Sequence, residues 1–576
     1  MKKGCLFALG ALFVLFLVGA GSVVYLVARV QAPRVERGSY VEIRIGGSIP
    51  EYVLDDGLFG GRPVTMRDIA DVLDWAGDDE RVQGVVLRIE PLGIGWAKMQ
   101  EIRDHIEGVK TKGKDVVAFL EAGDDGEYYL ASAANKVFMA PMGNLGMDGL
   151  AVDVEFYRGL LDKVGVEYDG VHIGEFKSAP EQYSNTKMSD PARLQYEELL
   201  DGLFDGYVTA ISASRKLPRD KVRELIDQGP FSANAAKENG LVDELMYWDE
   251  FEEWVKNTSP SEPQIIEANR VLAMASRRNE VSAFSRSNIA VVYATGQIMS
   301  GESTSGGFGG EVMGSETIAE ALRDAREDDT VKAVVLRVDS PGGSVIASDV
   351  MWREVQVTRS KKPVVISMSD VAASGGYYIS MGANAIVAQP GTITGSIGIF
   401  TGKFVTTGLY GKVGLSTESI KRGAFADMYT GTRKFSEAER KKIEDELQDA
   451  YAVFIGKVAD GRSLDVGAVD KIARGRVWTG TAAKEVGLVD ELGGLEKAIE
   501  IAKAKANITG EAGIVLLPRR RSFWDQLGDN GSMIDVATPG IRLPPPAEEA
   551  MSGIEALSRL PEGEPTMWMP QRITVE

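Results

Sequence analysis

The chain repeats itself at a fixed spacing, and this duplication limits its possible folds more than any other feature. Val82–Glu90 (VQGVVLRIE) resembles Val331–Asp339 (VKAVVLRVD), an offset of 249 residues, from 82 to 331. The same offset joins Phe59-Gly60-Gly61 to Phe308-Gly309-Gly310, Tyr128-Tyr129 to Tyr377-Tyr378, Asn135 to Asn384 and Gly174 to Gly423. A spacing held over more than about a hundred residues indicates an internal duplication.

The duplication predicts two homologous domains in the 576-residue chain. Gly240–Leu245 (GLVDEL) recurs at 487–492, an offset of 247 residues, so the second unit has lost two residues along the way. We predict one repeat at 39–257, a polar linker at 258–287 and a second repeat at 288–505. Residues 506–576 combine basic, proline-rich and acidic stretches and are predicted to form a loosely ordered tail.

Each repeat alternates short β-branched runs with amphipathic stretches. In the second repeat, the predicted buried strands include residues 289–293, 333–336 and 363–367. The predicted helices there include residues 317–325 and 436–458. Strands that alternate with helices favour an α/β fold with a largely parallel sheet in each repeat.

The N-terminus carries an apolar segment of the length that crosses a bilayer. Cys5 to Ala28 contains no charged residue, which is 24 residues from 5 to 28, and about 20 suffice for a transmembrane helix. We predict a retained anchor at 5–28 with a cytoplasmic N-terminus, because Lys2 and Lys3 precede it. A cleaved signal peptide ending near Val30-Gln31-Ala32 is the alternative. Either prediction places the body on the far side of the membrane.

Composition excludes several kinds of chemistry. The net charge of −20 argues against nucleic acid as a partner. Cys5 is the one cysteine, and His105 and His172 are the two histidines, so disulfides, thiolate zinc sites and histidine-rich metal sites are excluded. We expect no metal and no cofactor. Both histidines are interpreted as surface residues, with a general base at His172 as a minor alternative.

A glycine-rich turn follows the predicted strand of the second repeat. In Asp339–Ser344 (DSPGGS), Gly342 and Gly343 would let backbone N–H groups point outward at the start of a helix, which suits an oxyanion. A plain strand-to-helix turn is the alternative. The counterpart Glu90–Gly93 (EPLG) has no glycine pair. We therefore predict an oxyanion hole in the second repeat alone.

A serine and a lysine show complementary losses between the repeats. Ser396 follows Gly395 in a glycine-rich loop, and its counterpart is Met147. Lys177 lies in GEFKSAP, and its counterpart is Ala426. Each repeat has kept one member of a Ser/Lys pair and replaced the other by an inert residue. A single composite site at the junction of the repeats explains both losses. Burial would have to lower the pKa of the lysine, which is about 10.4 in water, before it could act as a base.

Four strings together resemble the bacterial signal peptide peptidases of the long, duplicated form, peptidase family S49. They are DSPGGS at 339–344, ASGGYY at 373–378, TGSIG at 394–398 and FKS at 176–178. The resemblance implies ClpP/crotonase-like repeats behind a membrane anchor, assembled as a homotetramer. It implies that Ser396 is the nucleophile and Lys177 the general base. The implied substrates are hydrophobic peptides such as cleaved signal peptides, degraded at the periplasmic face of the bacterial inner membrane.

Other readings of the same residues stay open. Ser374, in Ala-Ser-Gly-Gly, occupies the kind of turn where ClpP-like peptidases carry their nucleophile, and its counterpart is Asp125. We expect Ser374 and Gly395 near the site, with Ser374 as the competing nucleophile. A crotonase-type enzyme acting on acyl thioesters and a catalytically inactive membrane scaffold are the alternative functions.

Overall fold

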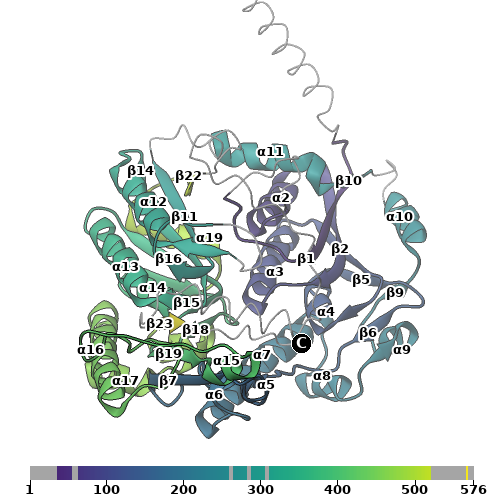
Figure 1. Ribbon diagram of the computed structural model, residues 1–576. Helices are drawn as coiled ribbons and strands as arrows, with labels where there is room; N and C mark the ends of the chain where they lie inside the picture. Colours follow the sequence, from purple (N-terminus) through teal and green to yellow (C-terminus); the bar gives the residue numbers. More distant parts are fainter. Residues whose placement is uncertain are drawn as a thin grey trace, which may run out of the picture.

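A computed structural model describes residues 35–54, 63–258, 264–281, 287–304, 311–519 and 566–568. The two repeats form two α/β units that lie side by side, the first drawn in purple and blue and the second in teal and green (Figure 1). The predicted anchor at 5–28 lies outside the described residues. Among the residues that are described, no helix combines the length and apolar character needed to cross a membrane.

The first repeat is built on a parallel sheet in the order β10-β1-β2-β3-β5-β9. Its strands are β1 (Ser39–Gly47), β2 (Val82–Leu92), β3 (Asp115–Leu120), β5 (Lys136–Met139), β9 (Glu244–Leu245) and β10 (Ile265–Glu267). A small separate sheet contains β4 (Gly123–Asp124), β6 (Asn144–Gly146) and β8 (Phe231–Ser232). Consecutive residues Val85, Val86 and Leu87 are all fully buried, as expected for a strand covered on both faces.

The second repeat has a matching sheet in the order β20-β18-β16-β14-β11-β22, with β17 beside β16 and β21 beside β17. Its strands are β11 (Asn288–Thr295), β14 (Val331–Ser340), β16 (Val364–Ala373), β17 (Ala385–Ala388), β18 (Ile393–Gly395), β20 (Val477–Thr479), β21 (Glu491–Leu492) and β22 (Gly513–Leu517). The predicted strand segments at 289–293 and 333–336 are confirmed. The third, 363–367, is a strand from Val364 onward.

Most helices of the first repeat have a counterpart in the second that begins and ends within two residues of the equivalent positions, and the short helix Glu181–Ser184 has none among the described residues. In the first repeat they are α2 (Met66–Asp78), α3 (Trp96–Thr111), α4 (Asp125–Ala131), α5 (Arg158–Val164), α6 (Glu181–Ser184), α7 (Asp190–Arg215), α8 (Arg219–Ile226), α9 (Ala233–Glu238) and α10 (Trp248–Lys256). In the second they are α12 (Ser315–Glu327), α13 (Val345–Arg359), α14 (Gly375–Ser380), α15 (Thr407–Val413), α16 (Glu437–Arg462), α17 (Val466–Ile472), α18 (Gly480–Glu485) and α19 (Leu495–Lys505). Both bounds of α2 and α12 differ by the repeat offset, which confirms the duplication.

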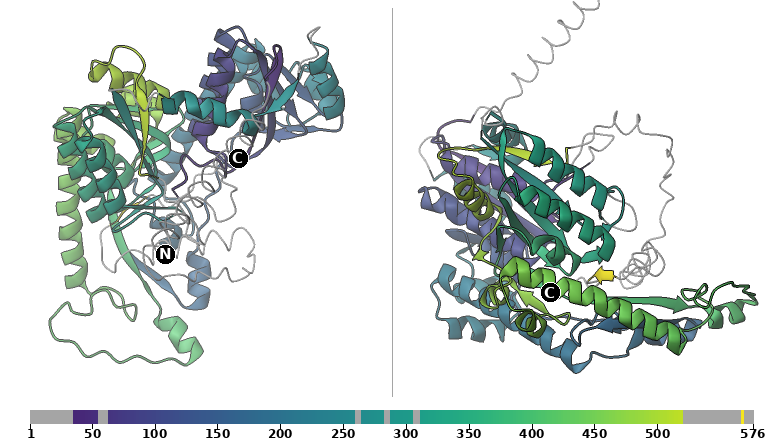
Figure 2. Two further views of the ribbon diagram at one scale, coloured as in Figure 1. Left: turned by 90° about the horizontal axis from the view of Figure 1, so that it is seen from above. Right: turned by 90° about the vertical axis from the view of Figure 1, so that its left-hand side faces the viewer.

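A strand of the first repeat pairs with a strand of the second along an arm that runs beneath both sheets (Figures 1 and 2). In the arm β7 (Glu167–Ile173) of the first repeat pairs antiparallel with β19 (Ile399–Val405) of the second. Neither strand has a strand at its equivalent position in the other repeat, because residues 150–156 and 416–422 contain none. A third sheet, in the order β13-β12-β15-β23-β19-β7, adds β12 (Gln297–Met299), β13 (Val312–Gly314), β15 (Gly342–Ser344) and β23 (Thr566–Trp568). The pairing of β7 with β19 therefore joins the two repeats.

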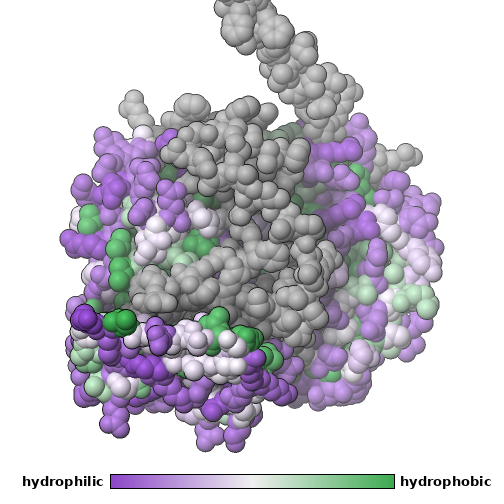
Figure 3. Space-filling view, in the orientation of Figure 1, coloured by the Kyte–Doolittle hydropathy of each residue, from purple (hydrophilic) through white to green (hydrophobic). Residues whose placement is uncertain are grey.

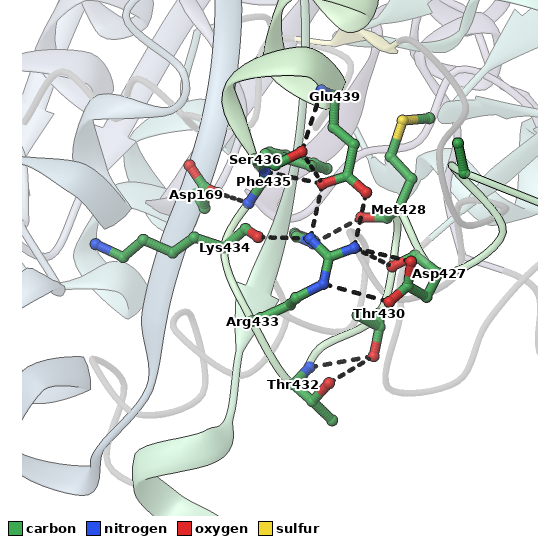
Figure 4. Close-up of polar contacts among 12 residues, drawn as sticks. Asp169, Asp427, Met428, Thr430, Thr432, Arg433, Lys434, Phe435, Ser436 and Glu439 are labelled. Atoms are coloured by element: carbon green, nitrogen blue, oxygen red, sulfur yellow. Dashed lines mark hydrogen bonds and ion pairs between the residues drawn. The ribbon is translucent and has the colours of Figure 1, made fainter. Parts of the chain in front are cut away.

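An arginine fixes the second-repeat part of the arm. The Arg433 guanidinium donates to Asp427 Oδ1 at 2.8 Å and to Glu439 Oε1 at 2.7 Å (Figure 4). The neighbouring Phe435 N–H donates to Asp169 Oδ2 in β7 at 2.7 Å. The start of α16 is thereby tied to the first repeat.

Apolar side chains lie exposed along this arm. Figure 3 shows hydrophobic patches in the lower part of the molecule, among hydrophilic residues. Val413, Leu415 and Ile420 are 67%, 52% and 89% exposed.

Two predicted irregular segments contain regular structure. The expected linker at 258–287 includes β10, which pairs with β1, and α11 (Ala268–Val281), which packs on α2. Val271 and Ala275 are buried one turn apart on α11, a pair too sparse to stand out in a polar sequence. In the expected tail after 506, β22 pairs with β11 and β23 pairs with β15. The strand pairing comes from the folded sheets, so the local composition did not reveal it.

A buried cluster of charges lies where the repeats meet. Arg337 of β14 is fully buried, and its Nη2 lies 2.9 Å from Glu51 Oε1 and 2.7 Å from Glu101 Oε2 of the first repeat. Burial alone would raise the pKa of Glu51, but the charges of Arg337 and Lys98 lower it to about 2. Glu51 is therefore ionised at neutral pH, and its ion pair with Arg337 joins the two repeats.

His105 of α3 is not the ordinary surface residue that the sequence suggested. Its side chain is 10% exposed, and its Nδ1 lies 2.9 Å from Asp74 Oδ1. Burial alone would lower the pKa of His105, but the hydrogen bond and charge of Asp74 raise it to about 9. His105 lines a pocket of about 450 Å³ together with Glu101 and with Glu496 of the second repeat. The sequence pattern placed His105 on an exposed helix face, but residues of the second repeat lie against that face.

Candidate active site

Two serines lie at the ends of neighbouring parallel strands. Ala373 of β16 pairs with Gly395 of β18, and each is followed directly by a serine. The Ser374 N–H donates to the Gly395 carbonyl at 2.8 Å. Ser374 and Ser396 both have left-handed backbone, with φ of 55° and 49°. Such conformations are costly for residues other than glycine and are concentrated at functional sites.

The pairing of β7 with β19 brings a lysine to these serines. Ile173 is opposite Ile399 in the antiparallel pair, so the residues after Ile173 run beside those before Ile399. Lys177 Nζ lies 3.0 Å from Ser396 Oγ and 2.8 Å from Ser374 Oγ. It also lies 3.2 Å from the Ser396 carbonyl oxygen. The residues predicted from the complementary losses are therefore in direct contact.

A short backbone segment after α17 supports both sides of this contact. The Phe176 N–H donates to the Arg474 carbonyl at 3.0 Å, and the Ser396 N–H donates to the Arg476 carbonyl at 2.7 Å. Gly475 lies between them, and a β-carbon there would lie 2.4 Å from the Lys177 nitrogen. Only glycine allows this approach, so Gly475 sets the distance between the two loops.

Gln195 of α7 adds a second support. Its Nε2 donates to Ser178 Oγ at 2.9 Å, and its Oε1 accepts from the Val477 N–H at 3.4 Å. Sequence reasoning missed Gln195 and Gly475. Their counterparts at the 247-residue offset, Lys442 and Gln228, differ from them in type, which is the pattern that identified the serine and the lysine.

Burial sets the electrostatics of the site. Lys177 is 1% exposed, Ser396 is 2% exposed and Ser374 is fully buried. Desolvation disfavours the ammonium form and lowers the pKa of Lys177 to about 7. Within the part of the chain that the structure describes, no acidic side chain contributes to this shift. A lysine in this state can hold or release a proton near neutral pH.

The glycine turn predicted as an oxyanion hole lies against the same serines. Gly342 and Gly343 have φ of 99° and 158°. A β-carbon on Gly375, the residue after Ser374, would lie 3.1 Å from the Gly343 nitrogen. The Gly342 N–H donates to Ser340 Oγ at 3.2 Å. The turn is therefore close enough to face a group held at the serines.

The counterparts of Ser396 and Lys177 form no such site among the described residues. Met147, the counterpart of Ser396, is buried in the first-repeat core, and Ala426, the counterpart of Lys177, is exposed in the arm. His172 is exposed on β7, and its Nδ1 lies 3.1 Å from the Gly174 carbonyl. No contact joins His172 to either serine among the described residues, so the histidine alternative has no support.

Comparison with known proteins gives consistent matches. The model of peptidase family S49 matches residues 109–260 and 356–509. The chain is similar to the chloroplastic serine protease SPPA of Arabidopsis thaliana, with 36% identity over 87% of this chain and 74% of the relative. It is similar to Protease 4 of Salmonella typhi, with 36% identity over 77% of this chain and 72% of the relative. It is also similar to Protease 4 of Haemophilus influenzae, with 32% identity over 77% and 74%.

Proposed function

This chain belongs to peptidase family S49 and is a serine peptidase, and from that premise we propose that Ser396 is its nucleophile and Lys177 its general base. The observation that carries the proposal is the 3.0 Å contact between Lys177 Nζ and Ser396 Oγ at a buried position. A nucleophile and base within hydrogen-bond distance are the arrangement that activates a serine. Burial of the lysine supplies the lowered pKa that this chemistry needs.

The proposed reaction begins with a neutral Lys177. A neutral amine has two N–H donors and one lone pair, so it can donate to Ser374 Oγ while accepting a hydrogen bond from the Ser396 hydroxyl. As Ser396 Oγ attacks the peptide carbonyl, Lys177 takes its proton. The resulting ammonium protonates the leaving amine, and water then releases the acyl group by the reverse sequence. In this scheme Ser374 orients the lysine.

The developing oxyanion is assigned to the turn at Gly342 and Gly343. Backbone N–H groups aimed at the position where charge develops stabilise the transition state. Because the Gly342 N–H already donates to Ser340 Oγ, the Gly343 N–H is the better candidate of the two. The scheme needs no metal or cofactor.

We extend the proposal to the substrates of the protein, its location and its assembly. The motif resemblance supports hydrophobic peptides, such as cleaved signal peptides, as substrates. It also supports a membrane anchor at 5–28, a catalytic body on the periplasmic side, ClpP/crotonase-like repeats and a homotetramer. The family assignment favours peptide hydrolysis over the acyl-thioester and scaffold alternatives.

The test compares hydrolysis of a fluorogenic apolar peptide by the full chain and by three variants. Ser396→Ala and Lys177→Ala should each lower kcat by roughly a thousandfold or more, because removing either member of a unit disables the whole unit. Ser374→Ala should keep part of the activity. The exposed residues Ser416 and Lys187 provide matched controls, since Ser416→Ala and Lys187→Ala should be fully active.

Two results would redirect the assignment. Activity retained in Ser396→Ala but lost in Ser374→Ala would move the nucleophile to Ser374. A folded wild-type chain that cleaves no apolar peptide would favour the scaffold alternative. Circular dichroism of each variant distinguishes lost chemistry from lost structure.

A further inference from the structure

Residues near the end of the chain form a strand inside the active site. β23 pairs antiparallel with β15, with Gly343 opposite Met567 and Ser344 opposite Thr566. On its other side Thr566 pairs with Phe400 of β19. Figure 1 shows β23, in yellow, beside β15 and β19. The strand thus lies between the glycine turn and the strand that follows Ser396.

The backbone of β23 reaches the position assigned to a reacting carbonyl. A β-carbon on Gly342 would lie 2.0 Å from the carbonyl oxygen of Met567 and 2.7 Å from the nitrogen of Gly375. The Met567 oxygen therefore lies at the glycine turn, beside the residue that follows Ser374. In the proposed reaction this is where the carbonyl of a peptide substrate must lie.

The side chains of β23 are buried by the same surroundings. Met567 is fully buried and belongs to the hydrophobic core of the second repeat, and Thr566 is 3% exposed. An apolar side chain is thus enclosed next to a backbone held by strand pairing. Peptide recognition by strand addition works in this way, with main-chain bonds giving affinity and side-chain pockets giving specificity.

We propose that Thr566–Trp568 occupies the substrate cleft as a tethered peptide strand and competes with peptide substrates. The inference rests on the proposed function, because it takes Ser396 and the glycine turn as the catalytic centre. The pocket that encloses Met567 is then the pocket for the substrate residue whose carbonyl is attacked. It selects an unbranched apolar side chain.

A tethered competitor changes one kinetic constant in particular. Its local concentration stays constant when the protein is diluted, since the strand belongs to the same chain. The apparent substrate affinity equals the intrinsic affinity multiplied by the fraction of molecules whose cleft is open. Saturating substrate displaces the strand, so kcat is unaffected while the apparent KM is raised.

The experiment compares the full chain with Met567→Asp, which puts a carboxylate into the apolar pocket. The apparent KM for an apolar peptide should fall by about threefold or more, with kcat unchanged. Met551→Asp is the matched control, because it makes the same change in the same C-terminal region outside β23, and its KM should equal that of the wild type. A synthetic peptide of residues 560–576, added to Met567→Asp, should restore the higher KM competitively.

The outcomes separate this inference from the proposed function. An active Met567→Asp chain with wild-type KM, not inhibited by the peptide, would overturn the inference and leave the serine peptidase assignment intact. If neither chain cleaves any peptide, the proposed function fails, and fluorescence anisotropy of a labelled 560–576 peptide decides the inference alone. Binding to Met567→Asp but not to the wild type supports it, and no binding to either refutes it. If Met567→Asp melts at a lower temperature, a chain ending at Pro565 replaces it in the same measurements.

Discussion

Two buried lysines show how the surroundings of a residue decide its chemistry. Lys98 and Lys177 are both buried, at 8% and 1% exposed. For Lys98, burial alone would lower the pKa, but nearby carboxylates raise it, with Asp339 Oδ2 at 2.9 Å. Among the described residues, Lys177 Nζ has hydrogen bonds to serine oxygens alone, so burial acts unopposed and lowers the pKa of Lys177 to about 7. The first lysine is held as a cation, and the second is free to exchange a proton.

This difference predicts the pH dependence of the reaction. In the proposed mechanism the neutral form of Lys177 is the base, and this form is lost as the pH falls through the lowered pKa. We expect kcat/KM to decrease tenfold per unit below about pH 7 and to level off above it. The measurement is kcat/KM with a non-ionising peptide substrate between pH 5 and pH 9. A profile that is flat down to pH 5, or that rises only near pH 10, would contradict the assigned base.

Much of the candidate site could be predicted at the level of single residues. Ser396 and Lys177 were identified because each had an inert counterpart in the other repeat, and Ser374 was expected nearby. Gly475 and Gln195 were missed because their contacts depend on the final packing of loops that are far apart in the sequence. The strand at Met567 was missed for the same reason.

At the scale of elements, the register between β7 and β19 determines whether the site exists. Gly170 is opposite Gly402 in this pair, and the Tyr168 ring lies over both glycines. A β-carbon on Gly402 would lie 2.2 Å from Tyr168 Oη, and one on Gly170 would lie 2.4 Å from the same ring. The glycines make room for the ring, and the ring fixes how closely the two strands approach.

Gly402→Ala should therefore disturb catalysis through the strand pair. The added methyl group must displace the Tyr168 ring, which shifts the loops carrying Ser396 and Lys177. We expect kcat to fall by about tenfold or more, since small misplacements of reacting groups are costly. Gly411→Ala is the control, because a β-carbon there has no atom within 4 Å, and it should be as active as the wild type. Equal activities of the two variants would show that the β7–β19 register does not limit the reaction.

The elements also show which parts of the fold the sequence could predict. β11 and α12 were predicted because they have strong apolar patterns over many residues. β10 and β23 have three residues each and are strands because a partner strand lies beside them. β7 and β19 have no strand at the equivalent positions of the other repeat, so comparing the repeats gives no signal for this pair.

At the scale of the whole molecule, the two repeats are joined by charges that cannot be exposed without unfolding. Arg337 has no exposed surface, and its partners Glu51 and Glu101 come from the other repeat. In the first repeat, the equivalent residue is Arg88, which is 20% exposed and pairs with Glu121, which is 72% exposed. The duplicated arginine has become an interface residue in one repeat and stayed a surface residue in the other.

Substituting the two arginines should have unequal effects on stability. Arg337→Met leaves the buried carboxylates of Glu51 and Glu101 without their shared guanidinium, and we expect a loss of about 3–5 kcal/mol in the free energy of unfolding. Arg88→Met breaks an exposed pair and should cost about 1 kcal/mol or less. Urea denaturation followed by tryptophan fluorescence measures both. Similar losses in the two variants would mean that the interface charges contribute no more than surface charges.

The division of the proposed dyad between the two repeats also orders events during synthesis. Lys177 and Ser396 are 219 residues apart in the chain. At typical translation rates of about 5–20 residues per second, the serine is made on the order of 10–40 s after the lysine. Until then the nascent chain contains half of a dyad, and it still needs β19 and the segment at Gly475 to bring the halves together. With the proposed dyad, a peptidase built in this way is inert while it is being made.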